Sequence, residues 1–249
     1  NGGKVTKWAD ASGFGNHATN ATYRPTVVSG AVNGHAAVKF VHSSQQMLFL
    51  PTTTFQGMSS LSNSTVFIVN KWSGTTTSVG LFGQWKSSDS TPNCHFEVKS
   101  GGVLRLRIAD VDLESVSGIL TQGQWATVAG VSDMSRESRY VSIFKDGRQI
   151  LSREGSVGTT SFSRADRLYI GNSCDIPTGS SQRGYDGEIA EVLLFNRALT
   201  MDERMGIELY LANKYGTAGA TPQLQTNFSL SGPGETLVLT QPQGVVEDS

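Results

Sequence analysis

Residues Tyr185–Gly216 read YDGEIAEVLLFNRALTMDERMGIELYLANKYG, and this stretch decides the fold. Its first part, Gly187–Asn196, has the dense apolar content of a strand that closes a sheet. An amphipathic helix follows, with Thr200 as N-cap, Glu203 three residues later to complete a capping box, and Gly216 where a helix ends. We therefore expect a long strand followed by a helix that covers one sheet or one end of it.

Two carboxylates of this strand, Glu188 and Glu191, are three residues apart. In regular pairing, residues three apart face opposite sides of a sheet, because side chains alternate with a period of two. These two residues are therefore not expected to form a carboxylate pair, and the stretch specifies the fold rather than chemistry.

Short strand candidates separated by turn residues fill the rest of the chain up to this point. The dipeptides Asn33-Gly34 and Asp146-Gly147 are strong signals for tight hairpin turns. Many short strands with frequent turns and a single helix predict an all-β sandwich. The predicted strands are Pro25–Ser29, Ala36–Phe40, Met47–Leu50, Thr65–Lys71, Gly80–Trp85, His95–Lys99, Val103–Ala109, Gln124–Ser132, Tyr140–Phe144, Gln149–Ser152 and Arg167–Gly171.

The composition excludes several classes of function. The 249 residues are 37% hydrophobic and 16% charged, with a formal net charge of −1. Such a balance gives no electrostatic footprint for nucleic acid or an anionic membrane. No apolar run approaches the ~20 residues that a membrane-spanning helix needs. A surface made of Ser, Thr, Asn and Gly favours a secreted or cell-surface protein, and Asn1 in place of an initiator Met suggests a processed or excised segment.

The two cysteines, Cys94 and Cys174, are too few for a disulfide scaffold or a zinc site. They are either two small thiols or, in an exported protein, one disulfide that joins two strand ends. Both alternatives stay open at the level of sequence.

Several motifs resemble, in their order, the laminin-G-like modules of bacterial surface and secreted proteins. They are WADASGFGNHATN, GHAAVKF, STVFIV, GQWATVAGV, IFKDGR, RLYIGN and DGEIAEVLLFNRALTMDERMGIELYLANKYG, which together cover about Trp8 to Gly216. Those modules belong to the concanavalin A-like lectin/glucanase superfamily. The resemblance implies a jelly-roll sandwich of two curved antiparallel sheets.

The sequence changes character after Gly216. Residues 1–216 are expected to form the laminin-G-like domain, and 217–227, which are small, polar and contain Pro222, are expected to be a linker. Residues 228–249 predict a β-hairpin around Gly232-Pro233-Gly234, and they resemble the opening strands of a lamin-tail-type immunoglobulin-like domain. We therefore expect the chain to be part of a larger exported multidomain protein.

Asp110, Asp112 and Glu114 follow one another at every second position, which places three carboxylates on one face of a strand. Paired carboxylates suit retaining glycoside hydrolysis, with one as nucleophile and one as acid/base. The spacing resembles the E-x-D-x-E strand of glycoside hydrolases in the same superfamily, although Asp110 stands where that motif has Glu. A solvated strand end explains the triplet equally well.

A calcium site is a second candidate, because Ca²⁺ binds six to eight hard oxygen atoms. The loop containing Asp10 and Asn16, together with Asp186 and Glu188, could supply them. Related jelly rolls often carry a structural calcium, but Ala190 stands at the position that matches their strand aspartate. The alternative is that Asp10 and Asn16 organise a turn through side chain–backbone hydrogen bonds.

Ligand contacts are expected from two tryptophans near strand ends, Trp72 and Trp85, and from the polar cluster containing Asn172 and Asp175. An exposed indole can stack on a sugar ring, and long polar loops at a sandwich edge tend to carry binding function. The four histidines have neither metal-binding spacing nor a nucleophile nearby.

These observations leave two functions from different classes. We favour a non-catalytic binding or adhesion module for a glycan or an extracellular protein, with carbohydrate as the favoured ligand. The alternative is a polysaccharide-active enzyme that uses Asp110, Asp112 and Glu114. The enzyme requires two carboxylates close together in a groove, whereas the binding module does not. A purely structural spacer in the parent protein is a third possibility.

Overall fold

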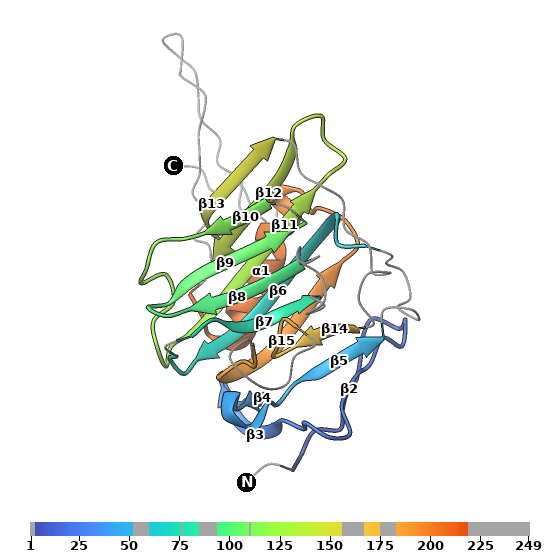
Figure 1. Ribbon diagram of the computed structural model, residues 1–249, viewed down its shortest axis with the longest axis vertical. Helices are drawn as coiled ribbons and strands as arrows, with labels where there is room; N and C mark the ends of the chain where they lie inside the picture. The colour runs from blue at the N-terminus through green and yellow to red at the C-terminus, as the bar shows by residue number, and fades with distance from the viewer. Residues whose placement is uncertain are drawn as a thin grey trace, which may run out of the picture.

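A computed structural model describes residues 3–51, 60–75, 77–84, 94–109, 111–155, 167–174 and 183–218. These residues form two antiparallel β-sheets that lie face to face, with one helix on the outer side of one sheet (Figure 1). The all-β sandwich and its single C-terminal helix are thereby confirmed. Trp85, Asp110, Asp175 and the predicted hairpin at 228–249 lie outside the described residues, as does all of the predicted linker beyond residue 218.

The two sheets have the following strands in spatial order. The eight-stranded sheet contains β1 (Lys7–Trp8), β2 (Ala18–Thr19), β5 (Leu48–Pro51), β14 (Arg167–Ile170), β7 (Val79–Gln84), β8 (Cys94–Lys99), β9 (Val103–Ile108) and β10 (Val111–Glu114). The seven-stranded sheet contains β13 (Arg148–Gly155), β12 (Arg139–Lys145), β11 (Trp125–Asp133), β6 (Asn63–Trp72), β15 (Gly187–Phe195), β4 (His35–Phe40) and β3 (Thr26–Val32). A 3-10 turn, His42–Ser44, follows β4, and α1 spans Met201–Tyr215.

Turn chemistry sets the hairpins where the sequence predicts them. Asn33 and Gly34 both have positive φ, 45° and 79°, as do Asp146 and Gly147, at 48° and 80°. Two positive φ values in succession match the right-handed twist of the flanking strands, and Asn, Asp and Gly adopt them at low cost. These turns fix the registers of β3 with β4 and of β12 with β13.

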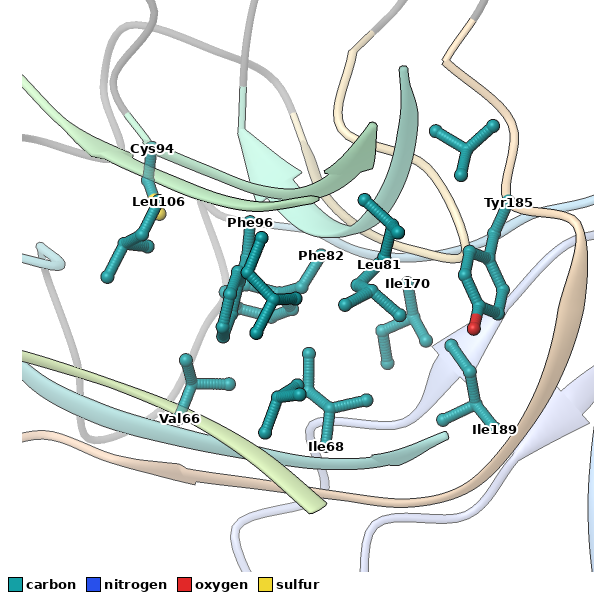
Figure 2. Close-up of a cluster of buried hydrophobic side chains, with 14 of the residues drawn as sticks. Val66, Ile68, Leu81, Phe82, Cys94, Phe96, Leu106, Ile170, Tyr185 and Ile189 are labelled. Carbon is teal, nitrogen blue, oxygen red and sulfur yellow. The ribbon is translucent and has the colours of Figure 1, made fainter. Parts of the chain in front are cut away.

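The main core fills the space between the two sheets (Figure 2). Phe82 and Phe96 from the eight-stranded sheet face Ile68 from the seven-stranded sheet, and all three are almost fully buried. Tyr185 enters the same core just before β15, and its hydroxyl donates to Asn70 Oδ1 at 3.0 Å. This bond satisfies the polar end of an otherwise apolar side chain, as a buried tyrosine requires.

A second apolar cluster joins α1 to the outer face of the seven-stranded sheet. Leu211 and Tyr215 of the helix pack in one cluster with Phe67 and Val69 of β6. The predicted capping box is present: Thr200 Oγ1 accepts from Glu203 N at 3.3 Å, and Glu203 Oε2 accepts from Thr200 N at 3.0 Å. The central strands β6 and β11 are consequently buried on both sides, which explains their continuous apolar runs.

A β-bulge in β15 corrects the expectation for its two glutamates. Glu188 lies opposite Lys71 of β6, whereas Glu191 lies opposite Val69, because the register shifts at Ala190. The extra residue brings both glutamates to the outer face of the sheet. They still form no carboxylate pair: Glu188 binds Lys71 at 3.0 Å and Glu191 binds Lys214 of α1 at 3.0 Å.

Three further findings complete the fold. Cys94 and Cys174 are both buried and form no disulfide, so the structure has thiols where the sequence allowed either thiols or a disulfide. Burial raises the pKa of the Cys94 thiol to about 12. Within the described chain, no helix, α1 included, is long and apolar enough to cross a bilayer.

Candidate functional site

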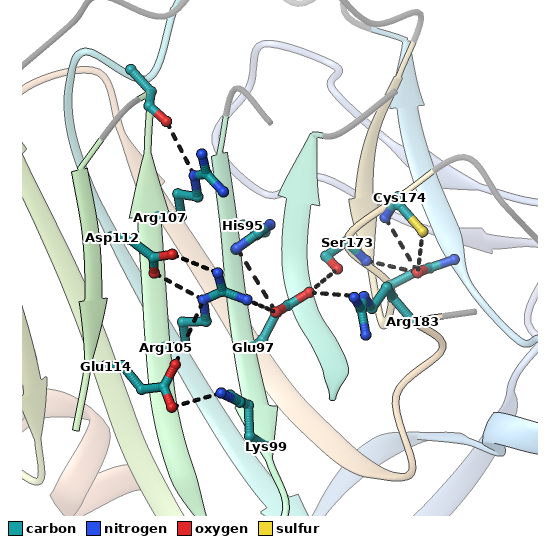
Figure 3. A network of polar contacts seen from close by, with 12 residues as sticks. His95, Glu97, Lys99, Arg105, Arg107, Asp112, Glu114, Ser173, Cys174 and Arg183 are labelled. Atoms are coloured by element: carbon teal, nitrogen blue, oxygen red, sulfur yellow. Dashed lines mark hydrogen bonds and ion pairs between the residues drawn. The ribbon is translucent and has the colours of Figure 1, made fainter. Parts of the chain in front are cut away.

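Charged side chains gather on the outer face of the eight-stranded sheet, over β8, β9 and β10 (Figure 3). These strands alternate strictly, so that their apolar residues enter the core while every second residue points outward. We call this surface the charged face. It consists of His95, Glu97, Lys99, Arg105, Arg107, Asp112 and Glu114, with Ser173 and Arg183 from the connection between β14 and β15.

Glu97 lies at the centre of the charged face and is fully buried. Its Oε1 accepts a hydrogen bond from Ser173 Oγ at 2.8 Å and lies 3.6 Å from Arg183 Nε. Its Oε2 lies 3.6 Å from Arg105 Nη1 and 3.8 Å from His95 Nε2. A buried carboxylate needs such neighbours, because an uncompensated charge away from water is very costly. Glu97 therefore holds two strands and a loop together rather than facing a ligand.

Two glycines of β7 allow the 171–174 segment to cross the sheet at this point. A Cβ atom on Gly80 would lie 2.3 Å from the backbone nitrogen of Ser173, and one on Gly83 would lie 2.9 Å from Ser173 Cα. The predicted ligand residue Asn172 is fully buried here, where its Oδ1 accepts from the backbone nitrogens of Ser173 (2.8 Å) and Cys174 (3.3 Å). Asn172 thus shapes the loop that positions Ser173, and its side chain does not face outward.

Arg105 links the buried centre of the charged face to its exposed rim. Its guanidinium binds both carboxylate oxygens of Asp112, with Nε 2.8 Å from Oδ1, and also approaches Glu97 and Glu114. Hydrogen bonding to Arg105 holds the pKa of Asp112 below its usual range. At the rim, Lys99 Nζ binds Glu114 Oε1 at 2.6 Å. Both predicted catalytic carboxylates that the structure describes are therefore ion-paired.

Arg107 differs from the other cations of the charged face. In the strand registers it lies between His95 of β8 and Asp112 of β10. Its Nε donates to the carbonyl of Ala109 at 3.4 Å, and within the described ranges it forms no ion pair. Ala109 has a positive φ of 52° at the turn into β10. Arg107 is thus a partly buried guanidinium, oriented by one backbone contact, with donors that remain for a ligand.

His95, the neighbour of Arg107, is 4% exposed. Burial lowers the pKa of its imidazole to about 4, and the nearby charge of Glu97 opposes this shift only in part. The side chain is therefore neutral at neutral pH, so Arg107 lies next to a neutral histidine rather than a second cation.

Trp72, which was expected to stack on a ligand, lies in the main core with only 5% of its surface exposed. Residues 66, 68, 70 and 72 of β6 all point between the sheets, so the alternation of a regular strand carries the indole inward. Its Nε1 has no hydrogen-bond partner among the described residues. The flat face of the ring is therefore unavailable to a sugar, which corrects the expectation for this residue.

The four residues proposed for calcium do not come together as a ligand set. Asp10 Oδ1 accepts from Ser12 N, and Oδ2 accepts from Ser12 Oγ and Asn16 N, all at 2.8 Å, so this carboxylate organises its own loop. Glu188 is neutralised by Lys71. No cluster of three or more His, Cys, Asp or Glu in the described chain, which includes Asp186, could hold a metal. These four residues therefore form no calcium site in the described chain, and calcium binding by the protein stays a prediction from the sequence.

Sequence reasoning missed the residues that build the charged face, namely Glu97, Arg105, Arg107 and Ser173. The signal was present in two neighbouring strands, CHFEVK and VLRLRI, where polar or charged residues occupy every second position. Two such strands paired in a sheet must place these residues side by side on one surface. The contact of Glu97 with Ser173, 76 positions apart, has no signal in the sequence.

Comparison with known proteins identifies the family. A model of the concanavalin A-like lectin/glucanases superfamily matches residues 43–203. The chain belongs to this superfamily. Solved structures place it among related folds, although no curated protein sequence matches.

Three of the structures with TM-scores of 0.50 or higher illustrate this likeness. The binding domain of Paraclostridial Mosquitocidal Protein 1 has 12% identity and a TM-score of 0.63, with 87% of this chain and 54% of that chain covered. A mutant of NanB sialidase from Streptococcus pneumoniae has 18% identity and a TM-score of 0.53, with 68% and 26% covered. The CBM40 of the Ruminococcus gnavus IT-sialidase, bound to α2,3-sialyllactose, has 16% identity and a TM-score of 0.50, with 60% and 84% covered. At these identities the likeness shows the fold alone.

The superfamily includes glucanases, so the carboxylates need a direct test against catalytic geometry. A retaining hydrolase needs a nucleophile and a second carboxyl group whose pKa is raised so that it can donate a proton. Here Arg105 approaches Glu97, Asp112 and Glu114, and the pKa of Asp112 is lowered. The buried Glu97 cannot touch a sugar. The described carboxylates of the charged face are therefore arranged for ion pairing and not for acid–base chemistry.

Proposed function

We propose that this chain is a non-catalytic carbohydrate-binding module, and that its glycan contacts the charged face at Arg107. The observation that carries the proposal is the guanidinium of Arg107, which is partly buried, oriented by the carbonyl of Ala109 and without an ion pair in the described chain. Its planar set of donors suits the paired hydroxyls or a carboxylate of a sugar.

The surroundings of Arg107 support a rigid binding site. Asp112 is held by Arg105, and Glu97 is held from several sides by Ser173 and its charged neighbours. A site whose side chains are already fixed loses little conformational entropy when a ligand binds. The exposed oxygens of Asp112 and Glu114 at the same rim offer acceptors for sugar hydroxyls.

The superfamily supports the same ligand class. It unites lectins with glucanases, and one neighbour of this fold, the Ruminococcus gnavus CBM40, is bound to α2,3-sialyllactose. We further propose that the module is secreted or displayed at a bacterial cell surface within a larger multidomain protein. The charge-poor composition, with 16% charged residues, supports this location.

A glycan array tests the proposal with three variants and the unmodified protein. Arg107→Ala should lose at least about tenfold in affinity for any glycan that the unmodified protein binds, and Arg107→Lys should recover only part of it, because ammonium cannot reproduce the planar fork. Arg153→Ala removes an exposed arginine from β13 of the other sheet and is the matched control.

Three results would count against the proposal. Equal binding by Arg107→Ala and Arg153→Ala would remove the charged face as the site. Release of new reducing ends from a bound glycan would show hydrolysis and end the non-catalytic assignment. Complete absence of binding on the array would favour a protein ligand or a spacer role.

A further inference from the structure

A cavity of about 730 Å³ opens beside the second half of β15, and no residue of the charged face lines it. Its inner wall is apolar and includes Leu50, Phe82 and Ile170 of the main core, together with Val192 and Leu194 of β15. Its rim is polar. The rim residues are Asp10, Ser12, Asn16, Glu191, Asn196, Lys214 and Tyr215. A cavity of this size, apolar inside with a few polar groups at the rim, has the character of a ligand site.

The cavity follows an incompletely paired strand edge. β15 pairs with β6 from Gly187 to Phe195, but it pairs with β4 only from Gly187 to Ile189. Beyond the bulge, residues 191–195 therefore have no strand on their second side among the described residues. All five are only partly buried, unlike most of the first half of the strand. Such an edge presents backbone N–H and C=O groups that can pair with another chain.

Proteins usually blunt a free edge with lysine, proline or a bulge. Here the bulge at Ala190 precedes the free segment, which then reads EVLLF with a single charge at its start. Val192 and Leu194 face the main core side, whereas Glu191 and Leu193 face α1. The side chains of the free edge therefore alternate with a period of two. The core side is apolar, and the side facing α1 begins with the charged Glu191.

The loop before β2 places an aromatic side chain at the mouth of the cavity. Phe14 is 60% exposed and lines the opening. It is flanked by Gly13 and Gly15, both with positive φ, at 90° and 76°. Asp10 fixes the loop through its hydrogen bonds to Ser12 and Asn16. An exposed Phe in a loop that is fixed in this way is a candidate contact residue for a ligand.

The charges at the rim favour a basic ligand. Asp10 and Glu191 contribute two carboxylates, and Lys214 contributes one cation, which is already bound to Glu191 at 3.0 Å. Hydrogen bonds from Ser12 lower the pKa of Asp10, so it carries its charge at neutral pH. The rim thus retains an excess of one negative charge, which complements a cationic side chain that points outward.

We propose that the free edge of β15 and the adjoining cavity form a peptide-binding site, in which an extended segment with alternating apolar and basic or hydroxyl side chains adds as a strand. Backbone hydrogen bonds to residues 191–195 provide affinity, the cavity takes the apolar side chains, and Phe14 covers them. This site is independent of the glycan-binding proposal, because the two share no residue.

Synthetic peptides provide the test. We would use a set of about nine-residue peptides in which Val, Leu or Phe alternates with Lys and Thr, and measure binding by fluorescence anisotropy. The matched control peptides carry N-methyl groups on alternate residues, which removes edge-facing donors while the side chains stay the same. We expect at least one unmethylated peptide to bind and its methylated form to bind at least about tenfold more weakly.

Two protein variants locate the site. Ala18→Leu fills the cavity from β2, where Ala18 is buried, and Phe14→Ser removes the exposed aromatic without touching the core. Both should weaken peptide binding at least about tenfold, which corresponds to about 1.4 kcal/mol. Val116→Ser is the control, because Val116 is exposed and does not line the cavity. Phe14→Ser keeps the test valid if Ala18→Leu fails to fold.

Three results of the peptide measurements alone would overturn the proposal. These are the absence of binding by the whole peptide set, equal binding of methylated and unmethylated peptides, and binding that neither variant weakens. Self-association of the chain that Phe14→Ser abolishes would assign the edge to a second copy instead. Loss of peptide binding in Arg107→Ala would merge this site with the glycan site, and it too would contradict the proposal.

Discussion

The two outer faces of the sandwich differ although the sheets share one core. On the seven-stranded sheet, α1 packs through Leu211 and Tyr215 over β6, and a second apolar cluster covers part of the outer side. On the eight-stranded sheet, β9 and β10 alternate between core residues and charged residues, which contact one another through Arg105 and Glu97. One face is largely covered by apolar packing of a helix, and the other carries a network of ion pairs.

The difference shows which face is available for binding. A face covered by a helix is already buried by the protein's own packing. A charged face with a preformed network can exchange some of its contacts with a ligand. The same difference predicts how each face responds to substitution and to pH.

Leu211→Ala should have the largest effect. Leu211 is fully buried between α1 and the seven-stranded sheet, and such a truncation costs about 4 kcal/mol of unfolding free energy. Leu209→Ala changes the same helix at a side chain that is 46% exposed, and it should cost less than about 1 kcal/mol. Urea unfolding measures both, and equal losses would mean that the helix does not cover the sheet as described.

The charged face should make stability depend on pH through His95. Burial lowers its folded pKa to about 4, while the unfolded chain keeps a value near 6.5. Between these values the unfolded state binds the proton and the folded state does not. Stability is therefore fully present above about pH 6.5, falls as pH decreases, and has lost about 3 kcal/mol near pH 4.

Unfolding of the unmodified protein and of His95→Gln between pH 7 and about 4.5 isolates this effect. Carboxylates also titrate in the lower part of this range, but they contribute to both proteins. Glu97, Arg105, Arg107 and Asp112 are the charged groups that act on His95, and all remain in the variant. A parallel loss of stability in both proteins would show that His95 is not the source.

Arg105→Met should have a smaller effect on the same face. The change keeps an apolar stem but removes the cation beside Glu97, Asp112 and Glu114. Because Glu97 keeps Ser173 and Arg183, we expect a loss of about 2 kcal/mol, below that of a fully orphaned buried charge. Arg107→Met is the control and should change stability by less than about 0.5 kcal/mol, since no buried carboxylate depends on it. A larger loss in Arg107→Met would reverse the roles of the two arginines.

Most of the fold follows from local pattern. The capping box at Thr200, the hairpins at Asn33-Gly34 and Asp146-Gly147, and the strands of the two sheets are set by hydrogen-bonding and steric rules that act over a few residues. The bulge at Ala190 escaped prediction because a bulge depends on the register with β6, which a single strand does not encode.

The candidate site was less accessible from the sequence. The carboxylates Asp112 and Glu114 were recognised as neighbours on one strand face, but their neutralisation by Arg105 and Lys99 required strands β8 and β9 to lie beside them. Trp72 and Asn172 have the residue types of ligand contacts, yet burial gives both a structural role. Residue type suggests chemistry, and only the packing decides which side of the sheet it faces.

Addition or removal of calcium should have the smallest effect on stability. Glu188 lies on the helix-covered side and its charge is neutralised by Lys71, and Asp10 uses both oxygens within its own loop. In the described chain these carboxylates belong to no cluster of three or more that could supply the several oxygens Ca²⁺ requires. Thermal unfolding with calcium chloride and with EDTA should therefore agree. A site with a dissociation constant a hundredfold below the calcium concentration would add about 2.7 kcal/mol. If calcium gave such a gain and Asp10→Asn abolished it, the predicted calcium site at the Asp10 loop would be supported. That loop, which belongs to neither outer face, would then have a binding role of its own.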